Sequence, residues 1–122
     1  MPLVLIVDDN DGNRKLARVV LREDGFETVE AATGADGIAL AIEHVPDVIL
    51  MDLRLPDMDG VEATRRLKEN ERASRIPVVA MSVMQLEESG GWLEAAGFAG
   101  WLAKPIRVGT FPDQVRLYCA GG

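Results

Sequence analysis

The sequence predicts an α/β fold built on a parallel sheet, because apolar runs alternate with helical patterns along its 122 residues. Three continuous apolar runs rich in branched residues, at 3–7, 48–51 and 77–81, are typical of strands that are buried on both faces. Weaker runs at 26–32 and 97–103 predict two further strands. Right-handed crossovers between parallel strands place helices on both faces of such a sheet.

The first two helices follow from apolar stripes with charged residues on the opposite side. A stripe over 16–21, with basic residues outside it, predicts a helix that ends at Gly25, a residue suited to a left-handed stop. A second stripe over 38–45 predicts a helix that Pro46 ends.

The remaining helices are predicted over 60–70, 86–96 and 110–119. Gly90 and Gly91 fall in the early part of the fourth helix, where each glycine costs about 1 kcal/mol relative to alanine. We therefore expect this helix to be short, to start late or to be mobile, and the last helix to be brief. Five strand–helix repeats then make one domain over 1–122.

Composition narrows the function. A hydrophobic content of 48% supports a compact core, and a net charge of −7 argues against nucleic acid as a direct partner. No apolar run approaches the roughly 18 to 20 residues that a membrane span needs, so we expect a cytoplasmic protein without a membrane partner. Cys119 is the only cysteine and is interpreted as a packing residue.

Polar residues stand where four of the predicted strands end. Asp8 and Asp9 follow the first run, Asp52 the third, Ser82 the fourth and Lys104 the fifth. In a parallel sheet the carboxyl ends of the strands share one edge, where ligands bind. These five side chains are therefore predicted to converge there.

A calcium-binding loop of the EF-hand type does not explain the acidic residues. With Gly12 as the sixth position, the first ligand is Val7 and the last is Arg18, and neither binds calcium. The second acidic stretch fails in the same way, with Leu55 first and Arg66 last.

Magnesium and phosphoryl transfer suit these residue types. Three carboxylates at one point repel one another unless a cation is present, and oxygen ligands without sulfur or imidazole favour Mg²⁺. An Asp carboxylate can accept a phosphoryl group, whose charge then needs the metal, a lysine and a hydroxyl donor. Lys104 and Ser82 supply those two groups.

The chain resembles the receiver domain of two-component response regulators over nearly its whole length. The matching segments are "LIVDDN" (5–10) with Asn13, "ILMDLRLPDMDG" (49–60), "VAMS" (79–82) and "GWLAKPI" (100–106). It is most similar to the stand-alone receivers of bacterial cell-cycle and phosphorelay control. The resemblance implies a flavodoxin-like (βα)5 three-layer sandwich with parallel strand order 2-1-3-4-5.

The resemblance also implies the roles of the acidic residues. Asp52 would be the phosphoacceptor, taking the group from phosphohistidine on a sensor histidine kinase or a histidine phosphotransfer protein. Asp9 and Asp52 would bind Mg²⁺ directly, Asp8 largely through water, and Arg54 through its backbone carbonyl. The domain would catalyse its own phosphorylation and dephosphorylation without being an enzyme on other substrates.

Further expectations concern the switch. The resemblance makes Ser82 the switch hydroxyl, Lys104 the counter-charge with a cis bond to Pro105, and Trp101 the switch aromatic. It places the downstream partner on the face formed by the fourth helix, fifth strand and fifth helix.

Three residues near the site are expected to tune the lifetime of the phosphoryl group. Val83 follows the switch serine where the family usually has a smaller residue. Arg54 and Met84 stand two residues beyond Asp52 and Ser82, where we expect Met84 to exclude water and Arg54 to add charge. We therefore expect a long-lived phosphoprotein.

Structural interpretations remain as alternatives. Asp57 and Asp59 are better explained as turn and N-cap residues before Gly60. For the site residues the alternatives are helix capping by Asp8, Asp9 and Ser82, turn formation by Asp52, a surface position for Lys104 and static packing of Trp101.

Three other function classes also remain. A magnesium phosphatase or phosphotransferase is disfavoured because no cap insertion is present and Arg54 stands where such enzymes have a second Asp. A nucleotide- or flavin-binding module is disfavoured because no Gly-rich phosphate loop follows the first strand. A pseudo-receiver that binds a partner without phosphorylation is disfavoured because all five site residues are present.

Overall fold

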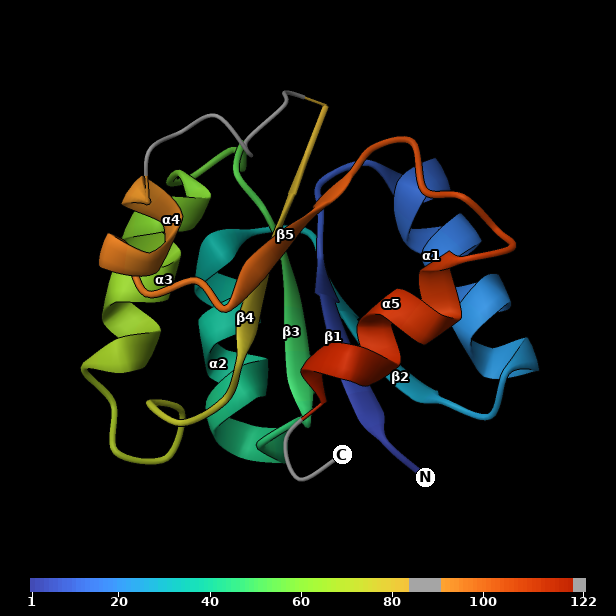
Figure 1. Ribbon diagram of the computed structural model, residues 1–122. Helices are drawn as coiled ribbons and strands as arrows, with labels where there is room; N and C mark the ends of the chain where they lie inside the picture. Colours follow the sequence, from blue (N-terminus) through green and yellow to red (C-terminus); the bar gives the residue numbers. More distant parts are fainter. Residues whose placement is uncertain (84–90, 120–122) are drawn as a thin grey trace.

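A computed structural model of the protein describes residues 1–83 and 91–119. Strands and helices alternate along the chain (Figure 1). Their bounds are β1 Leu3–Val7, α1 Asp11–Glu23, β2 Glu27–Ala31, α2 Gly34–His44, β3 Val48–Asp52, α3 Gly60–Lys68, β4 Val78–Ser82, α4 Trp92–Ala95, β5 Gly100–Ala103 and α5 Phe111–Tyr118. The predicted succession of strands and helices is confirmed.

The five strands form one parallel sheet in the order β2-β1-β3-β4-β5, as predicted. Helices α1 and α5 cover one face of the sheet, and α2, α3 and α4 lie on the other (Figure 1). The connection from β1 to β2 through α1 lies on one face, and the later connections through α2, α3 and α4 lie on the other, which makes the fold a flavodoxin-like three-layer sandwich.

The central strands explain why the apolar runs are continuous. Every residue of β3 and β4 is buried. Because side chains alternate across a strand, Val48 and Leu50 pack with α1 and α5, whereas Ile49 and Met51 pack with α2 and α3. Each of these strands therefore contributes side chains to the hydrophobic cores on both faces of the sheet, which requires apolar residues at consecutive positions.

The apolar stripe predicted for helix α1 is buried, with one exception. Ala17, Val20 and Leu21 are buried, but Leu16 is 40% exposed. The Asn10 side chain caps the helix by accepting a hydrogen bond from the Asn13 amide at 2.8 Å.

The fourth helix is short among the described residues, as expected. It begins at Trp92, after Gly91 in a left-handed conformation with φ 87°. The predicted start at 86–90 lies outside the described residues. Gly97, with φ 99°, follows the helix, so β5 begins at Gly100 rather than within the predicted run from 97.

Helix α5 is brief, as predicted. Within the described part of the chain, none of the helices is long and apolar enough to cross a membrane.

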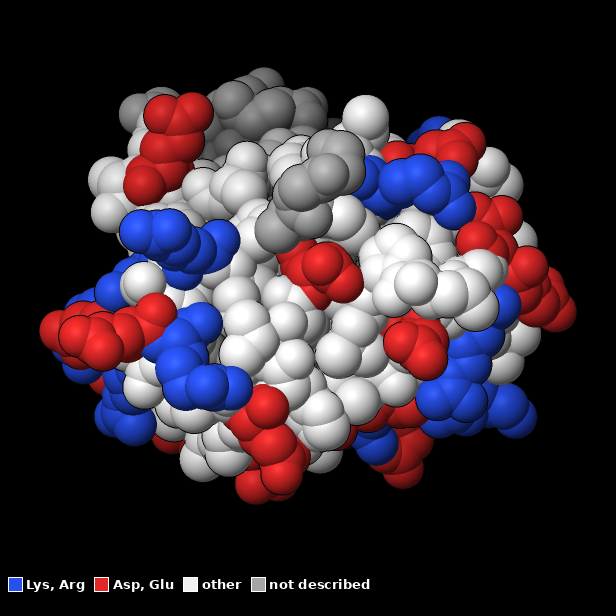
Figure 2. Space-filling view, turned by 90° about the horizontal axis from the view of Figure 1, so that it is seen from below, with Lys and Arg blue, Asp and Glu red and all other residues white. Residues whose placement is uncertain are grey.

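Charge is mixed at the end of the molecule opposite the carboxyl ends of the strands (Figure 2). Basic side chains lie at both sides of this face, close to acidic ones. On α3, Arg65 pairs with Glu62 and Glu69, and Arg66 also pairs with Glu62. The two arginines of this helix are therefore paired locally with acidic residues, whereas Lys68 donates to the backbone carbonyls of Ser74 and Ile76.

Candidate functional site

The predicted residues meet at the carboxyl edge of the sheet. Carboxylate oxygens of Asp8, Asp9 and Asp52 all lie within 4.8 Å of one another. Ser82 and Lys104 line the same open pocket. The sheet order thus brings together five side chains from four separate segments.

Burial divides the acidic residues. Asp8 and Asp52 are only 6% and 8% exposed, whereas the Asp9 residue is exposed. Ser82 is 7% exposed and stands at the end of β4. Buried carboxylates need a cationic partner, because burial without one strongly disfavours the charged form.

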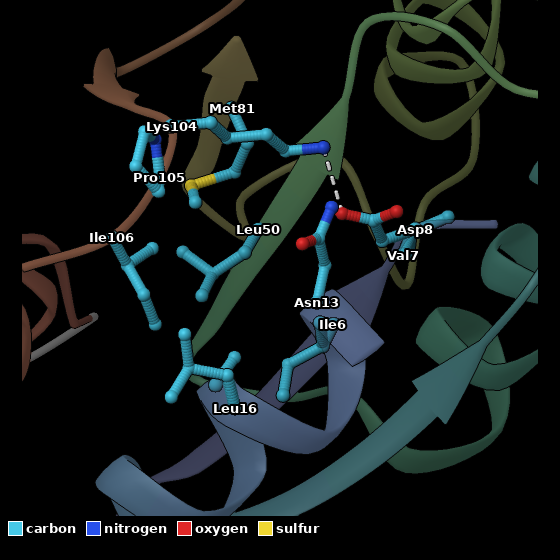
Figure 3. Close-up of a pocket in the computed structure, with 11 residues that line it drawn as sticks. Ile6, Val7, Asp8, Asn13, Leu16, Leu50, Met81, Lys104, Pro105 and Ile106 are labelled. Carbon is cyan, nitrogen blue, oxygen red and sulfur yellow. Dashed lines mark ion pairs between the residues drawn. The ribbon is translucent and has the colours of Figure 1, made fainter. Parts of the chain in front are cut away.

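Lys104 supplies that partner. Its Nζ lies 2.7 Å from Asp8 Oδ2 and 2.9 Å from Asp52 Oδ2, and Figure 3 shows the lysine reaching across to Asp8. Burial alone lowers the pKa of Lys104, but the hydrogen bonds and charges of the two carboxylates outweigh it and raise the pKa. The lysine therefore stays protonated and bridges the two strand ends. The predicted surface alternative for this residue is wrong.

Backbone amides orient the other oxygen of each buried carboxylate. Asp8 Oδ1 accepts from the Asn10 amide at 2.9 Å, and Asp52 Oδ1 accepts from the Arg54 amide at 3.0 Å. Each aspartate thus forms a turn with the residue two positions on. Both carboxylates are held before any ligand arrives.

The donor set fits Mg²⁺. It consists of carboxylate oxygens, and no His or Cys belongs to the cluster found among the described residues. Ligands on one Mg²⁺ at 2.0–2.1 Å are at most about 4.2 Å apart. The observed spread of up to 4.8 Å is only slightly wider.

The loop after β3 is held close to the phosphoacceptor candidate. The Gly60 amide donates to the Leu53 carbonyl at 2.9 Å. A Cβ at Gly60 would lie 2.5 Å from the Asp52 carbonyl oxygen, so only glycine allows this approach. Asp59 caps α3 as predicted, accepting from the Glu62 amide.

Asp57 does more than the predicted turn. Its carboxylate accepts hydrogen bonds from the backbone amides of Gly34 and Ala35 at 2.8 and 3.0 Å, and these residues are more than twenty positions away in the sequence. These hydrogen bonds, that of Ala35 foremost, lower the pKa of Asp57. The loop beside Asp52 is therefore tied to the start of α2.

The remaining predicted residues lie around this centre. Val83 is 75% exposed at the rim of the pocket, and Arg54 also lines it. Met84 lies outside the described residues. Trp101 is half-buried, packs against the core beneath α2 and α3, and lines a groove with the start of α5. The Lys104–Pro105 bond is cis, as expected.

A small apolar pocket lies behind Lys104, between α1 and the segment after β5 (Figure 3). Ile6, Leu16, Leu50, Met81 and Ile106 point into it. Leu16 therefore lines this pocket on one side while part of its side chain remains exposed to solvent.

Known proteins resemble this chain over most of its length. The family model for the response regulator receiver domain matches residues 4–116. The polar-differentiation response regulator DivK of Brucella ovis is 36% identical over 115 residues, which cover 94% of each chain.

Solved structures show the same fold. The chemotaxis response regulator CheY4 of Vibrio cholerae has a TM-score of 0.90 and 28% identity, over 97% of this chain and 98% of its own. The receiver domain of a sensor histidine kinase from Pseudomonas aeruginosa PAO1 has a TM-score of 0.84 and 30% identity, over 96% of each chain. That receiver was crystallised with a magnesium ion coordinated in its active-site cleft.

Proposed function

Because the chain belongs to the response regulator receiver domain family and is a phosphoacceptor signalling switch of two-component systems, we propose that Asp52 is the residue that accepts the phosphoryl group. The observation that carries this proposal is the bridge from Lys104 to Asp8 and Asp52 in one pocket. A phosphoacceptor needs a nearby cation and a second acid to hold metal, and both are present.

The phosphoryl donor is proposed to be phosphohistidine on a sensor histidine kinase or a histidine phosphotransfer protein. An oxygen of Asp52 attacks phosphorus, the new O–P bond forms, and the N–P bond to the donor imidazole breaks. When bound, Mg²⁺ would neutralise charge on the transferring group. Asp9 and Asp52 would hold the metal directly, Asp8 would hold it through water, and Arg54 would hold it through its backbone carbonyl.

The chain's own residues then stabilise the product. Lys104 already contacts Asp52 and is placed to pair with a phosphoryl oxygen once that group is attached. We assign the second contact to the Ser82 hydroxyl, since Ser82 ends the strand next to β3. The same site would catalyse both the phosphorylation and the dephosphorylation of the domain.

Three residues are proposed to set how long the phosphoryl group lasts. Val83 is exposed at the rim of the pocket and adds bulk there. Arg54 and Met84 are proposed to add charge and to exclude water. The double variant Arg54→Ala with Met84→Ala should lose phosphate faster than wild type, and an unchanged hydrolysis rate contradicts this assignment.

The output surface is proposed to be the face formed by α4, β5 and α5, with Trp101 as its moving aromatic residue. Trp101 lines the groove between β5 and the start of α5, together with Ile106, Thr110 and Gln114. Lys104 directly follows β5, the strand that contains Trp101, so a movement of Lys104 begins only three residues from this groove. We further propose that residues 1–122 form a single receiver domain that acts in the cytoplasm.

The proposal is tested by intact-protein mass after incubation with acetyl phosphate, with and without Mg²⁺. Wild type and the control Asp36→Ala, which changes an exposed carboxylate on α2, should gain one phosphoryl group only with Mg²⁺. Asp52→Ala should gain none. No gain by wild type while Mg²⁺ still binds would favour a pseudo-receiver.

A further inference from the structure

The Asp8 backbone is fixed at both of its polar groups. Its amide donates to the Ala31 carbonyl at 3.0 Å, so β2 holds the nitrogen side. Its carbonyl oxygen accepts a hydrogen bond of 2.6 Å from Nη1 of Arg14, one turn into α1. This carbonyl belongs to the peptide unit that joins Asp8 to Asp9. Fixing it therefore sets the direction in which Asp9 leaves the strand.

The Arg14 guanidinium is itself held on its other sides. Its side chain is only 16% exposed, and its Nε lies 3.4 Å from Oε1 of Glu30 on β2. A further ion pair joins its Nη2 to Asp11. Since the two carboxylates compensate its charge, the guanidinium adds little repulsion toward a cation bound beside Asp8 and Asp9.

We propose that Arg14 is a positioning residue for the metal site, acting through the Asp8–Asp9 peptide. This inference rests on the proposed function, because it concerns how the same acidic pair holds Mg²⁺. Asp9 needs such support because its side chain is exposed, whereas Asp8 and Asp52 are already held by Lys104 and by backbone amides. Arginine suits the position because its planar fork reaches several acceptors in fixed directions, which a lysine ammonium does not.

Helix α1 offers a matched control one turn further on. Arg18 donates from Nη1 to Oε2 of the same Glu30 at 2.7 Å. The Arg18→Gln change removes the same charge as Arg14→Gln. Among the described residues, the hydrogen bond to the Asp8 carbonyl comes from Arg14 and not from Arg18. Comparison of Arg14→Gln with Arg18→Gln separates positioning from charge, because loss of charge alone favours cation binding slightly in both.

The test measures Mg²⁺ affinity of the unphosphorylated protein by isothermal titration calorimetry. Arg14→Gln should weaken Mg²⁺ binding by roughly tenfold, the lower end of the effect of groups that orient metal ligands. Arg18→Gln should stay within about twofold of wild type, and Arg14→Lys should fall between. The amide NMR shift of Asp9 without metal should move in Arg14→Gln and not in Arg18→Gln.

A double-mutant cycle shows whether Arg14 acts through Asp9. In the Asp9→Asn background, Arg14→Gln should change Mg²⁺ affinity much less than in wild type. Equal affinities of Arg14→Gln and Arg18→Gln, or an undiminished effect in Asp9→Asn, would overturn the inference. If urea titration shows that Arg14→Gln is unfolded, the Arg14→Lys variant is measured in its place, since it keeps the positive charge and loses only the planar guanidinium.

The outcome is distinct from a failure of the proposed function. If Asp52 is not the phosphoacceptor, wild type gains no mass at any Mg²⁺ concentration. If only the inference is wrong, wild type is phosphorylated and Arg14→Gln needs no more Mg²⁺ than Arg18→Gln to reach the same rate.

Discussion

Replacing Gly60 by alanine should damage both stability and the site, because its Cβ would meet the backbone that carries Asp52. That Cβ would lie 2.5 Å from the Asp52 carbonyl oxygen and 2.9 Å from the Leu53 Cα. Ordinary contact begins at 3.4 Å, so α3 and the end of β3 would have to separate by close to an ångström. Both neighbours are backbone atoms and cannot turn aside. Overpacking of this kind typically costs about 1–3 kcal/mol, and we expect the free energy of unfolding to fall by that amount.

The assay is urea unfolding followed by circular dichroism, together with Mg²⁺ titration of the same samples. Gly109→Ala is the control, because a Cβ there meets nothing within 4 Å. Gly60→Ala should also bind Mg²⁺ more weakly, since the displaced carbonyl is that of Asp52. A loss of less than about 0.5 kcal/mol with unchanged Mg²⁺ affinity would show that the close approach at Gly60 is not what positions Asp52.

Three further changes test other contacts. Asp57→Asn should make the protein lose less stability in acid. The pKa of Asp57 is lowered in the folded state, so this carboxylate's contribution to stability is present above its ordinary pKa of 3.8 and is lost as the pH falls through the lower folded pKa. Thermal melts between about pH 2 and 5 would reveal the difference. Val45→Gly should cost less than Val19→Gly by about 1–2 kcal/mol in urea unfolding, because both valines are similarly exposed and only Val45 has positive φ, at 44°. Lys104→Met should bind Mg²⁺ at least about tenfold more tightly, because a competing charge is removed, yet its phosphorylation by acetyl phosphate should be slower than that of wild type.

The sequence was sufficient to predict the sheet and the meeting of the five site residues. Buried parallel strands leave a continuous apolar signal, which in β3 and β4 ends at Asp52 and Ser82. Once the strands are parallel, residues at their carboxyl ends must be neighbours. The convergence of Asp8 and Lys104 on this edge followed from topology, but two strands lie between β1 and β5, so their contact also depends on the long Lys104 side chain.

The contacts that hold the site together could not be predicted in this way. Asp57 was correctly placed in a turn, but its bonds to Gly34 and Ala35 depend on how closely α2 packs beside α3. The role of Arg14 was hidden for a similar reason, since a basic residue outside an apolar stripe is indistinguishable from a solvated one. Only the packing of α1 against the end of β1 turns it toward the Asp8 carbonyl.

Two contacts behind the site, those of Arg14 and Gly60, have the same physical role. Asp8 and Asp52 are buried beside each other, and in the absence of metal Lys104 offsets part of their negative charge. A metal that replaces the lysine must find carboxylates already directed toward it, because reorganising buried charges is costly. Groups behind the site supply that order: Arg14 donates to the Asp8 carbonyl, and the Gly60 amide donates to the carbonyl of Leu53, the residue after Asp52. The lysine can then be exchanged between carboxylate and phosphoryl group while the strand ends stay fixed, which is what a reversible phosphorylation switch requires.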